Sequence, residues 1–173
     1  YHTPLIIRQP GNAARAGMQI SVPTESIDVT PTILDWVGQE IPNAMDGRSL
    51  LPLLGGDVPP DWRRYSFSEL DFGEPMQPTV WQKALGTQVS ESNLSILRDE
   101  RFTLVEFAAD LAPMLFDGAG QGELENVATQ PEYQSDLNRL TRQMLRHRMK
   151  NMDHTLSLTA ITKTGAATRD RRG

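Results

Sequence analysis

The chain has 173 residues and a formal net charge of −5, with 38% hydrophobic and 23% charged residues. This length is enough for one domain with its own core, and the acidic balance argues against a nucleic-acid partner, which needs a basic surface. The chain has no cysteine, which excludes disulfides and thiolate metal sites, and its apolar runs are far shorter than the roughly 20 residues of a membrane span, so no membrane partner is expected.

The first predicted element is a short strand from Thr3 to Arg8, built on the apolar run Leu5, Ile6 and Ile7. An apolar run without alternation is typical of a strand buried on both faces of a parallel sheet. No further strand of that kind follows, so the element is expected to belong to a larger sheet. The alternative is a short edge strand in a small mixed sheet.

A helix is predicted from Asp28 to Val37. Asp28 is suited to the N-cap, and Pro31 falls in the first turn, where its missing N–H is not needed. Helical spacing places four apolar residues on one face, which is expected to face a core: Val29, Ile33, Trp36 and Val37. For Trp36 a structural role is favoured over stacking on a ligand. Gly38 ends the helix.

The middle of the chain predicts a small antiparallel sheet. The segment from Asp46 to Leu54 is interpreted as a turn at Asp46 and Gly47 that leads into one short helical turn. An alternating strand follows from Arg64 to Leu70. Residues Leu94 to Phe107 predict a β-hairpin with its turn near Asp99 and Glu100, and Pro113 to Asp117 predict one more strand. Together these segments give four strands.

The longest predicted helix runs from Pro131 to Met152. Its apolar stripe, expected to pack on the sheet, consists of Tyr133, Leu137, Leu140 and Met144. Acidic residues near its start and basic residues near its end match the helix dipole. Its basic face could indicate anion or membrane contact, but a solvated face is favoured. After His154 the composition predicts a tail.

Few residues are candidates for a site. His2 is a weak candidate for the wall of a substrate pocket, although a structural or solvated role is favoured. His147 and His154 lack a third zinc ligand, and the acidic set Glu69, Asp71 and Glu74 is favoured as a solvated edge. The glycine-rich run from Gly118 to Gly122 lacks the lysine and the helix start of a phosphate loop. No catalytic or metal-ligating residue is therefore assigned.

Four ordered segments resemble the late part of the sulfatase group of the alkaline phosphatase superfamily. They are YHTPLIIRQPG at the start, ESIDVTPTILDWVGQEIP with Asp28, Pro31, Thr32, Leu34 and Gly38, DGRSLLPLL from Asp46 to Leu54, and PMLFDGAGQGELENVA with Leu115, Asp117, Glu123, Asn126 and Ala128. The first two are most similar to phosphonate monoester hydrolases and the arylsulfatases closest to them.

The resemblance implies an α/β protein, α+β in this stretch. Residues 1–56 would end an alkaline-phosphatase-like catalytic domain, residues 57–154 would form a C-terminal subdomain of four antiparallel strands and a long helix, and residues 155–173 would be a flexible tail. A missing N-terminal catalytic region would be the main partner, and a homo-oligomer is also expected. The sequence does not determine the cellular compartment, and a cytoplasmic location is favoured.

The implied activity is hydrolysis of sulfate, phosphate or phosphonate esters of small molecules. Family members use a divalent metal (Ca, Mg or Mn) and a formylglycine made from a CxPxR or SxPxR motif, which this chain lacks. Catalytic residues are therefore expected before Tyr1, with none in this chain. The alternative is a non-catalytic structural or interaction module derived from the same fold.

Overall fold

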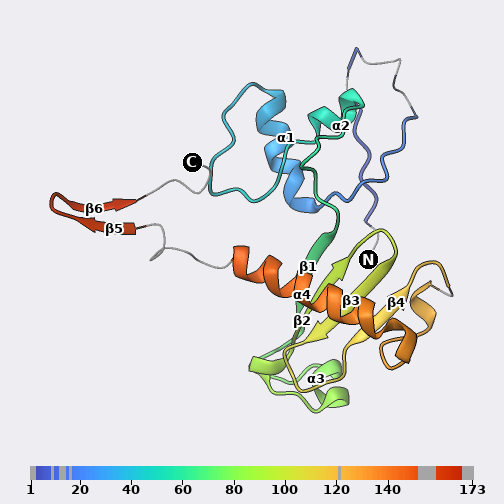
Figure 1. The fold of residues 1–173 in the computed structure, drawn as a ribbon. Coiled ribbons are helices and arrows are strands. Elements are labelled where there is room, and N and C mark those ends of the chain that lie inside the picture. Colours follow the sequence, from blue (N-terminus) through green and yellow to red (C-terminus); the bar gives the residue numbers. More distant parts are fainter. Residues whose placement is uncertain are drawn as a thin grey trace. The chain divides into compact units, whose positions relative to one another are not determined.

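The computed structural model describes residues 3–8, 10–11, 15, 17–120, 122–151 and 159–168. The chain divides into two compact units, Tyr1–Trp62 and Arg63–Gly173 (Figure 1). The first unit contains helices α1 (Val29–Trp36) and α2 (Leu51–Gly55), and a 3₁₀ turn, Ser26–Asp28, leads directly into α1. Its small core consists of Leu50, Leu53 and Trp62, against which Ile7 and Val22 pack.

The predicted strand from Thr3 to Arg8 is wrong. These residues have no regular structure, and Ile6 is 92% exposed. A strand exists only with a hydrogen-bonded neighbour, and the described residues of the first unit contain no other strand that could pair with this segment.

Helix α1 has the predicted position, and Gly38 follows it with a positive φ of 71°. The expectation that its apolar stripe faces a core is wrong for this chain, because Ile33 is 55% and Val37 63% exposed. Its buried residues are instead Pro31 and Thr32. The stripe remains a partly exposed apolar surface.

The second unit is built on one antiparallel sheet with the strand order β1-β2-β3-β4. The strands are β1 (Ser66–Asp71), β2 (Asn93–Arg98), β3 (Phe102–Phe107) and β4 (Met114–Asp117). In the register, Leu97 lies opposite Leu104 and Leu104 opposite Leu115, so the three leucines form a fully buried row across the sheet. The predicted four-stranded sheet is confirmed.

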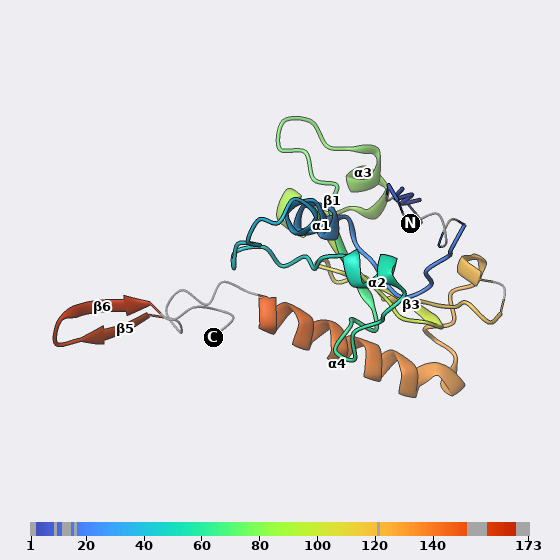
Figure 2. The same cartoon turned by 90° about the horizontal axis from the view of Figure 1, so that it is seen from above.

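Helix α4 (Gln134–Asn151) covers one face of this sheet (Figures 1 and 2). It follows a 3₁₀ turn, Pro131–Tyr133. The predicted stripe is confirmed, since Leu140 and Met144 are buried in the sheet core and Tyr133 and Leu137 pack against it. Loop residues Val127 and Ala128 complete that core.

Residues 72–92, here called the arm, leave the sheet between β1 and β2 and contain helix α3 (Val80–Leu85), which the sequence analysis did not identify. Buried Gln82 holds the arm together, because its side-chain oxygen accepts the N–H groups of Glu74 and Thr79 at 3.0 and 2.9 Å. The Thr79 hydroxyl accepts the Gln82 N–H and completes a capping box. At its base, Phe72 N–H donates to the Ser92 carbonyl at 2.8 Å.

Part of the predicted tail is ordered as a two-stranded hairpin, β5 (Thr159–Thr162) and β6 (Gly165–Thr168). Its turn uses Gly165 at a φ of 119°, and the Thr162 hydroxyl donates to the Gly165 carbonyl at 2.7 Å. This threonine- and glycine-rich segment, which was predicted as a tail, thus forms a pair of antiparallel strands.

Candidate functional site

Two of the three family-like motifs of the first unit, those around Asp28 and from Asp46 to Leu54, meet at the buried carboxylate of Asp28. Its Oδ2 accepts the N–H of Glu25 at 2.8 Å, and its Oδ1 accepts the N–H of Arg48 at 2.9 Å. Asp28 occupies the predicted N-cap position of α1, but it has helical dihedral angles and its side chain makes no cap hydrogen bond to that helix. Asp28 instead closes the preceding 3₁₀ turn in a capping box and connects α1 to the segment before α2.

Thr32 makes a second connection between the same two motifs. Its hydroxyl donates to the Asp28 carbonyl at 2.6 Å and accepts the N–H of Leu50 at 2.9 Å. Gly47 lies so close to the carbonyl of Ile27 that a side chain at position 47 would overlap it. We call Asp28, Thr32, Gly47, Arg48 and Leu50 the Asp28 cluster. It explains why the two motifs carry an aspartate, a threonine and a glycine at these positions.

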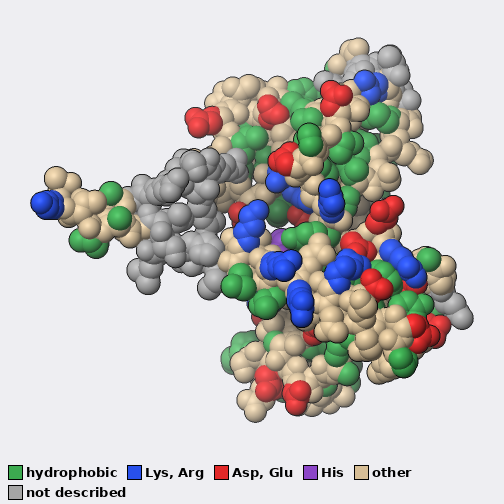
Figure 3. Space-filling model, viewed as in Figure 1, with side chains coloured by type: hydrophobic (Ala, Val, Ile, Leu, Met, Phe, Trp, Pro, Cys, Tyr) green, Lys and Arg blue, Asp and Glu red, His purple; other side chains and the backbone are tan. Residues whose placement is uncertain are grey.

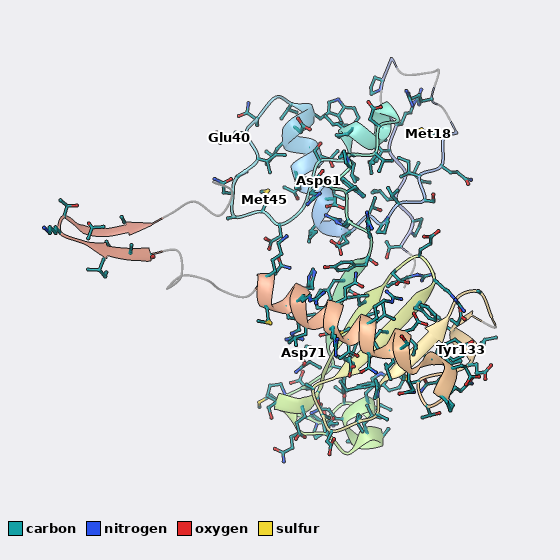
Figure 4. The ribbon with its side chains drawn as sticks, viewed as in Figure 1. Met18, Glu40, Met45, Asp61, Asp71 and Tyr133 are labelled. Carbon is teal, nitrogen blue, oxygen red and sulfur yellow. The ribbon has the colours of Figure 1, made fainter. Side chains whose placement is uncertain are left out.

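In the second unit, the family-like motif on β4 is fixed by Asp117. Arg101 donates to both oxygens of this carboxylate, at 3.0 and 2.6 Å, and the N–H of Ala119 donates to Oδ1 at 2.9 Å. The bond from Arg101, followed by that from Ala119, lowers the pKa of Asp117 to about 2. Burial and the nearby Asp117 carboxylate raise the pKa of Tyr133, which lies in the 3₁₀ turn just before α4 (Figure 4).

Asn126, from the same motif, connects β4 to the loop before α4. Its side-chain oxygen accepts the N–H of Leu115 at 2.9 Å and that of Ala128 at 3.0 Å. Glu123 forms an exposed ion pair with Arg98 at 3.5 Å. The motif residues Asp28, Asp117 and Asn126 therefore use their carboxylate and amide groups to fix the backbone around them.

The residues considered as metal ligands from the sequence do not come together in one site. Glu69 forms an ion pair with Arg148 at 2.9 Å, whereas the Asp71 carboxylate accepts the N–H of Gly73. His147 contacts the Phe67 ring at a centroid distance of 4.1 Å and the Tyr65 hydroxyl at 3.2 Å through Nδ1. Within the described ranges, no three His, Cys, Asp or Glu side chains group in a way that could hold a metal ion. His2 and His154 lie outside the described residues.

Sequence reasoning missed Arg48 and Arg101, and it identified Gly47 only as a turn residue. The signal for Gly47 was present in DGRSLLPLL, because a glycine before a helix often marks a close backbone approach. Arg101 had no such signal, since its pairing with Asp117 depends on the register of β3 against β4, where Phe102 lies opposite Asp117.

The family model described as N-sulphoglucosamine sulphohydrolase, C-terminal, matches residues 1–150. The chain belongs to this family. The predicted resemblance to the sulfatase group of the alkaline phosphatase superfamily is thereby confirmed, and the relatives support it. The multifunctional alkaline phosphatase superfamily protein PehA of Trinickia caryophylli is 36% identical over 98% of this chain and 33% of its own length.

Two solved structures of phosphonate monoester hydrolases also match. The structure from Silicibacter pomeroyi has 66% identity and a TM-score of 0.79 over 88% of this chain and 30% of that protein. The structure from Agrobacterium radiobacter has 35% identity and a TM-score of 0.75 over 89% of this chain and 30% of that protein. The chain thus spans about a third of the length of these relatives. In the described part of the chain, no helix combines the length and apolar character needed to cross a bilayer.

Proposed function

We propose that this chain is the C-terminal portion of a hydrolase that cleaves sulfate, phosphate or phosphonate esters, and that a preceding region supplies the catalytic residues. The observation that carries the proposal is the 66% identity to the phosphonate monoester hydrolase of Silicibacter pomeroyi, which covers 88% of this chain. That similarity favours phosphonate monoesters among the possible substrates. The family model, named for a sulphohydrolase, supports the broader class of ester hydrolysis.

The residues of this chain do not fit the metal and formylglycine that the family resemblance implies. The described residues lack a cluster able to bind a metal ion. Formylglycine requires CxPxR or SxPxR, and the nearest stretch, Ser21 to Glu25, has glutamate in place of the arginine. We therefore assign neither group to this chain, and propose that both belong to the preceding region.

The exposed apolar residues of the first unit support this division of roles. Leu5, Ile6, Ile33 and Val37 are exposed although their side chains favour burial. Ile33 and Val37 lie one helical turn apart and so share one face, and an exposed apolar face is typical of a contact with another part of a protein. We propose that the preceding region covers these residues, and that the Asp28 cluster keeps α1 in the orientation that this contact requires.

The test is to express the coding sequence that precedes Tyr1 together with this chain, and to measure hydrolysis of an aryl sulfate and of a phosphonate monoester. Metal-dependent turnover, faster for the phosphonate, is expected. The preceding sequence should also contain CxPxR or SxPxR. If that sequence lacks such a motif and the product is inactive on both esters, the hydrolase proposal is wrong and the non-catalytic module gains support.

A further inference from the structure

Two exposed apolar surfaces of the second unit have opposite charge. The first lies on the arm, where Val80 is 79% and Trp81 66% exposed, and Met76 of the same arm is 90% exposed. The arm and the strand end before it contain three exposed acidic residues, Asp71, Glu74 and Glu91, against one lysine, Lys83. Figure 4 labels Asp71 at the point where the arm begins.

The second surface is the outer face of α4. Leu145 and Met149 are each 57% exposed, although the opposite side of the same helix is buried in the sheet core. Arg142 and Arg146 follow the buried Leu140 and Met144 by two residues, or about 200° around the helix, which directs them outward. Figure 3 shows Lys and Arg side chains gathered over α4.

Part of the positive charge of α4 has no ion-pair partner among the described residues. Helix α4 contains five basic residues and one acidic residue in a chain whose net charge is −5. Arg139 and Arg148 form ion pairs with acidic side chains. In the described part of the chain, Arg142 and Arg146 form none.

We propose that the arm of one copy of this chain docks on the outer face of α4 in a second copy. In this contact Val80 and Trp81 cover Leu145 and Met149, and the acidic residues of the arm lie beside Arg142 and Arg146. Direct pairing of two α4 helices is disfavoured, because it would bring their basic residues together. Since both surfaces belong to the same unit, two copies related by a two-fold axis can exchange them.

The construction of the arm favours binding. The hydrogen bonds of Gln82 and Thr79 hold Val80 and Trp81 on an ordered backbone before any partner arrives. Docking therefore costs little additional conformational entropy. An exposed tryptophan on such a backbone is a typical residue to carry much of the binding energy. The contact goes beyond the proposed hydrolase activity, because it depends only on residues of the second unit.

The chain contains no cysteine, so single cysteines can report the contact directly. Chains carrying Val80→Cys and Leu145→Cys, distinguished by a mass tag, are mixed and treated with a short bismaleimide. We expect cross-linked pairs of the two variants to form at least about tenfold faster than pairs of Leu145→Cys with Glu100→Cys, because docking raises the local concentration of the thiols. Glu100 is an exposed residue of the β2–β3 turn and serves as the control. Equal rates for the two mixtures would overturn the proposal.

Sedimentation with charge variants is an independent test. Arg142→Glu combined with Arg146→Glu should raise the dissociation constant of the dimer at least about tenfold, as should Trp81→Ser. An equimolar mixture of these two proteins should recover part of the association, because one intact arm then meets one intact α4. Arg64→Glu, a charge reversal at another exposed site of the unit, should leave the constant unchanged. A monomeric wild type, or a mixture no more associated than its components, would contradict the docking.

Discussion

The α-carbon of Gly47 lies directly against the backbone carbonyl of Ile27, and a Cβ on Gly47 would overlap the carbonyl oxygen. This approach brings the Arg48 N–H to the Asp28 carboxylate, so the contact between residues 27 and 47 positions the whole Asp28 cluster. The cluster in turn connects α1 with the segment that leads into α2.

Gly47→Ala should therefore destabilise the first unit by about 1–3 kcal/mol, the usual cost of overpacking. The measurement is the free energy of unfolding in urea, followed by tryptophan fluorescence in a Trp36→Phe, Trp81→Phe background, where the remaining Trp62 reports the core of that unit. Gly55→Ala is the matched control, since a Cβ there meets nothing within 4 Å and the residue is helical. It should be neutral or stabilising by up to about 1 kcal/mol. Equal effects of the two changes would contradict the close approach.

Asp28→Ala should destabilise the same unit by about 2–4 kcal/mol, because it leaves the N–H groups of Glu25 and Arg48 without their carboxylate acceptor. Asp35→Ala, on the exposed side of α1, should change the free energy of unfolding by less than about 0.5 kcal/mol. Urea unfolding of both variants checks the difference. A loss at Asp28 no larger than that at Asp35 would refute the role of the cluster.

The second unit should lose stability in acid through Asp117. The pKa of this carboxyl is lowered from its ordinary 3.8 to about 2, first by the Arg101 hydrogen bond. A carboxyl whose pKa is lower in the folded state stabilises the fold above its unfolded pKa and loses that contribution as the pH falls toward the folded value. Asp117→Asn should thus flatten the decrease in stability between about pH 4 and pH 2. Asp110→Asn, a change at an exposed site of the same unit, should leave the decrease intact. The measurement is the free energy of unfolding as a function of pH. A flattened pH dependence for Asp110→Asn, or an unchanged one for Asp117→Asn, would count against this mechanism.

Helix α4 offers a matched pair for testing how it packs on the sheet. Leu140→Ala removes a fully buried side chain and should cost about 2–5 kcal/mol. Leu145→Ala, five residues further on an exposed face, should cost less than about 0.5 kcal/mol under conditions where the chain is monomeric. Thermal unfolding by circular dichroism measures both. Similar losses would show that α4 is oriented differently on the sheet.

Local sequence patterns predicted the second unit well, because the sheet and the helix that packs on it both lie within that unit. Two apolar faces were predicted, one on the strands around Leu97 and Leu104 and one on the helix through Leu140 and Met144. They pack against each other in one core within this unit. The register then brings Arg101 to Asp117, an ion pair that neither local pattern contains.

The first unit was predicted less well for the same physical reason. The apolar run Leu5, Ile6 and Ile7 predicts a buried strand, but a strand and its burial both require neighbours, which the described residues of this unit do not supply. The arm was missed for another reason. Helix α3 is held by the hydrogen bonds of one buried glutamine, Gln82. It lacks the hydrophobic periodicity from which helices are normally predicted.

The most direct measurement is hydrolysis by the purified chain alone, with aryl sulfate and phosphonate monoester as substrates and divalent metal ions added. We expect no metal-dependent turnover above that of the Asp28→Ala variant, because no catalytic group is assigned to these residues. Turnover by the wild-type chain that requires the metal and is lost in a folded variant of one of its own side chains would contradict the account.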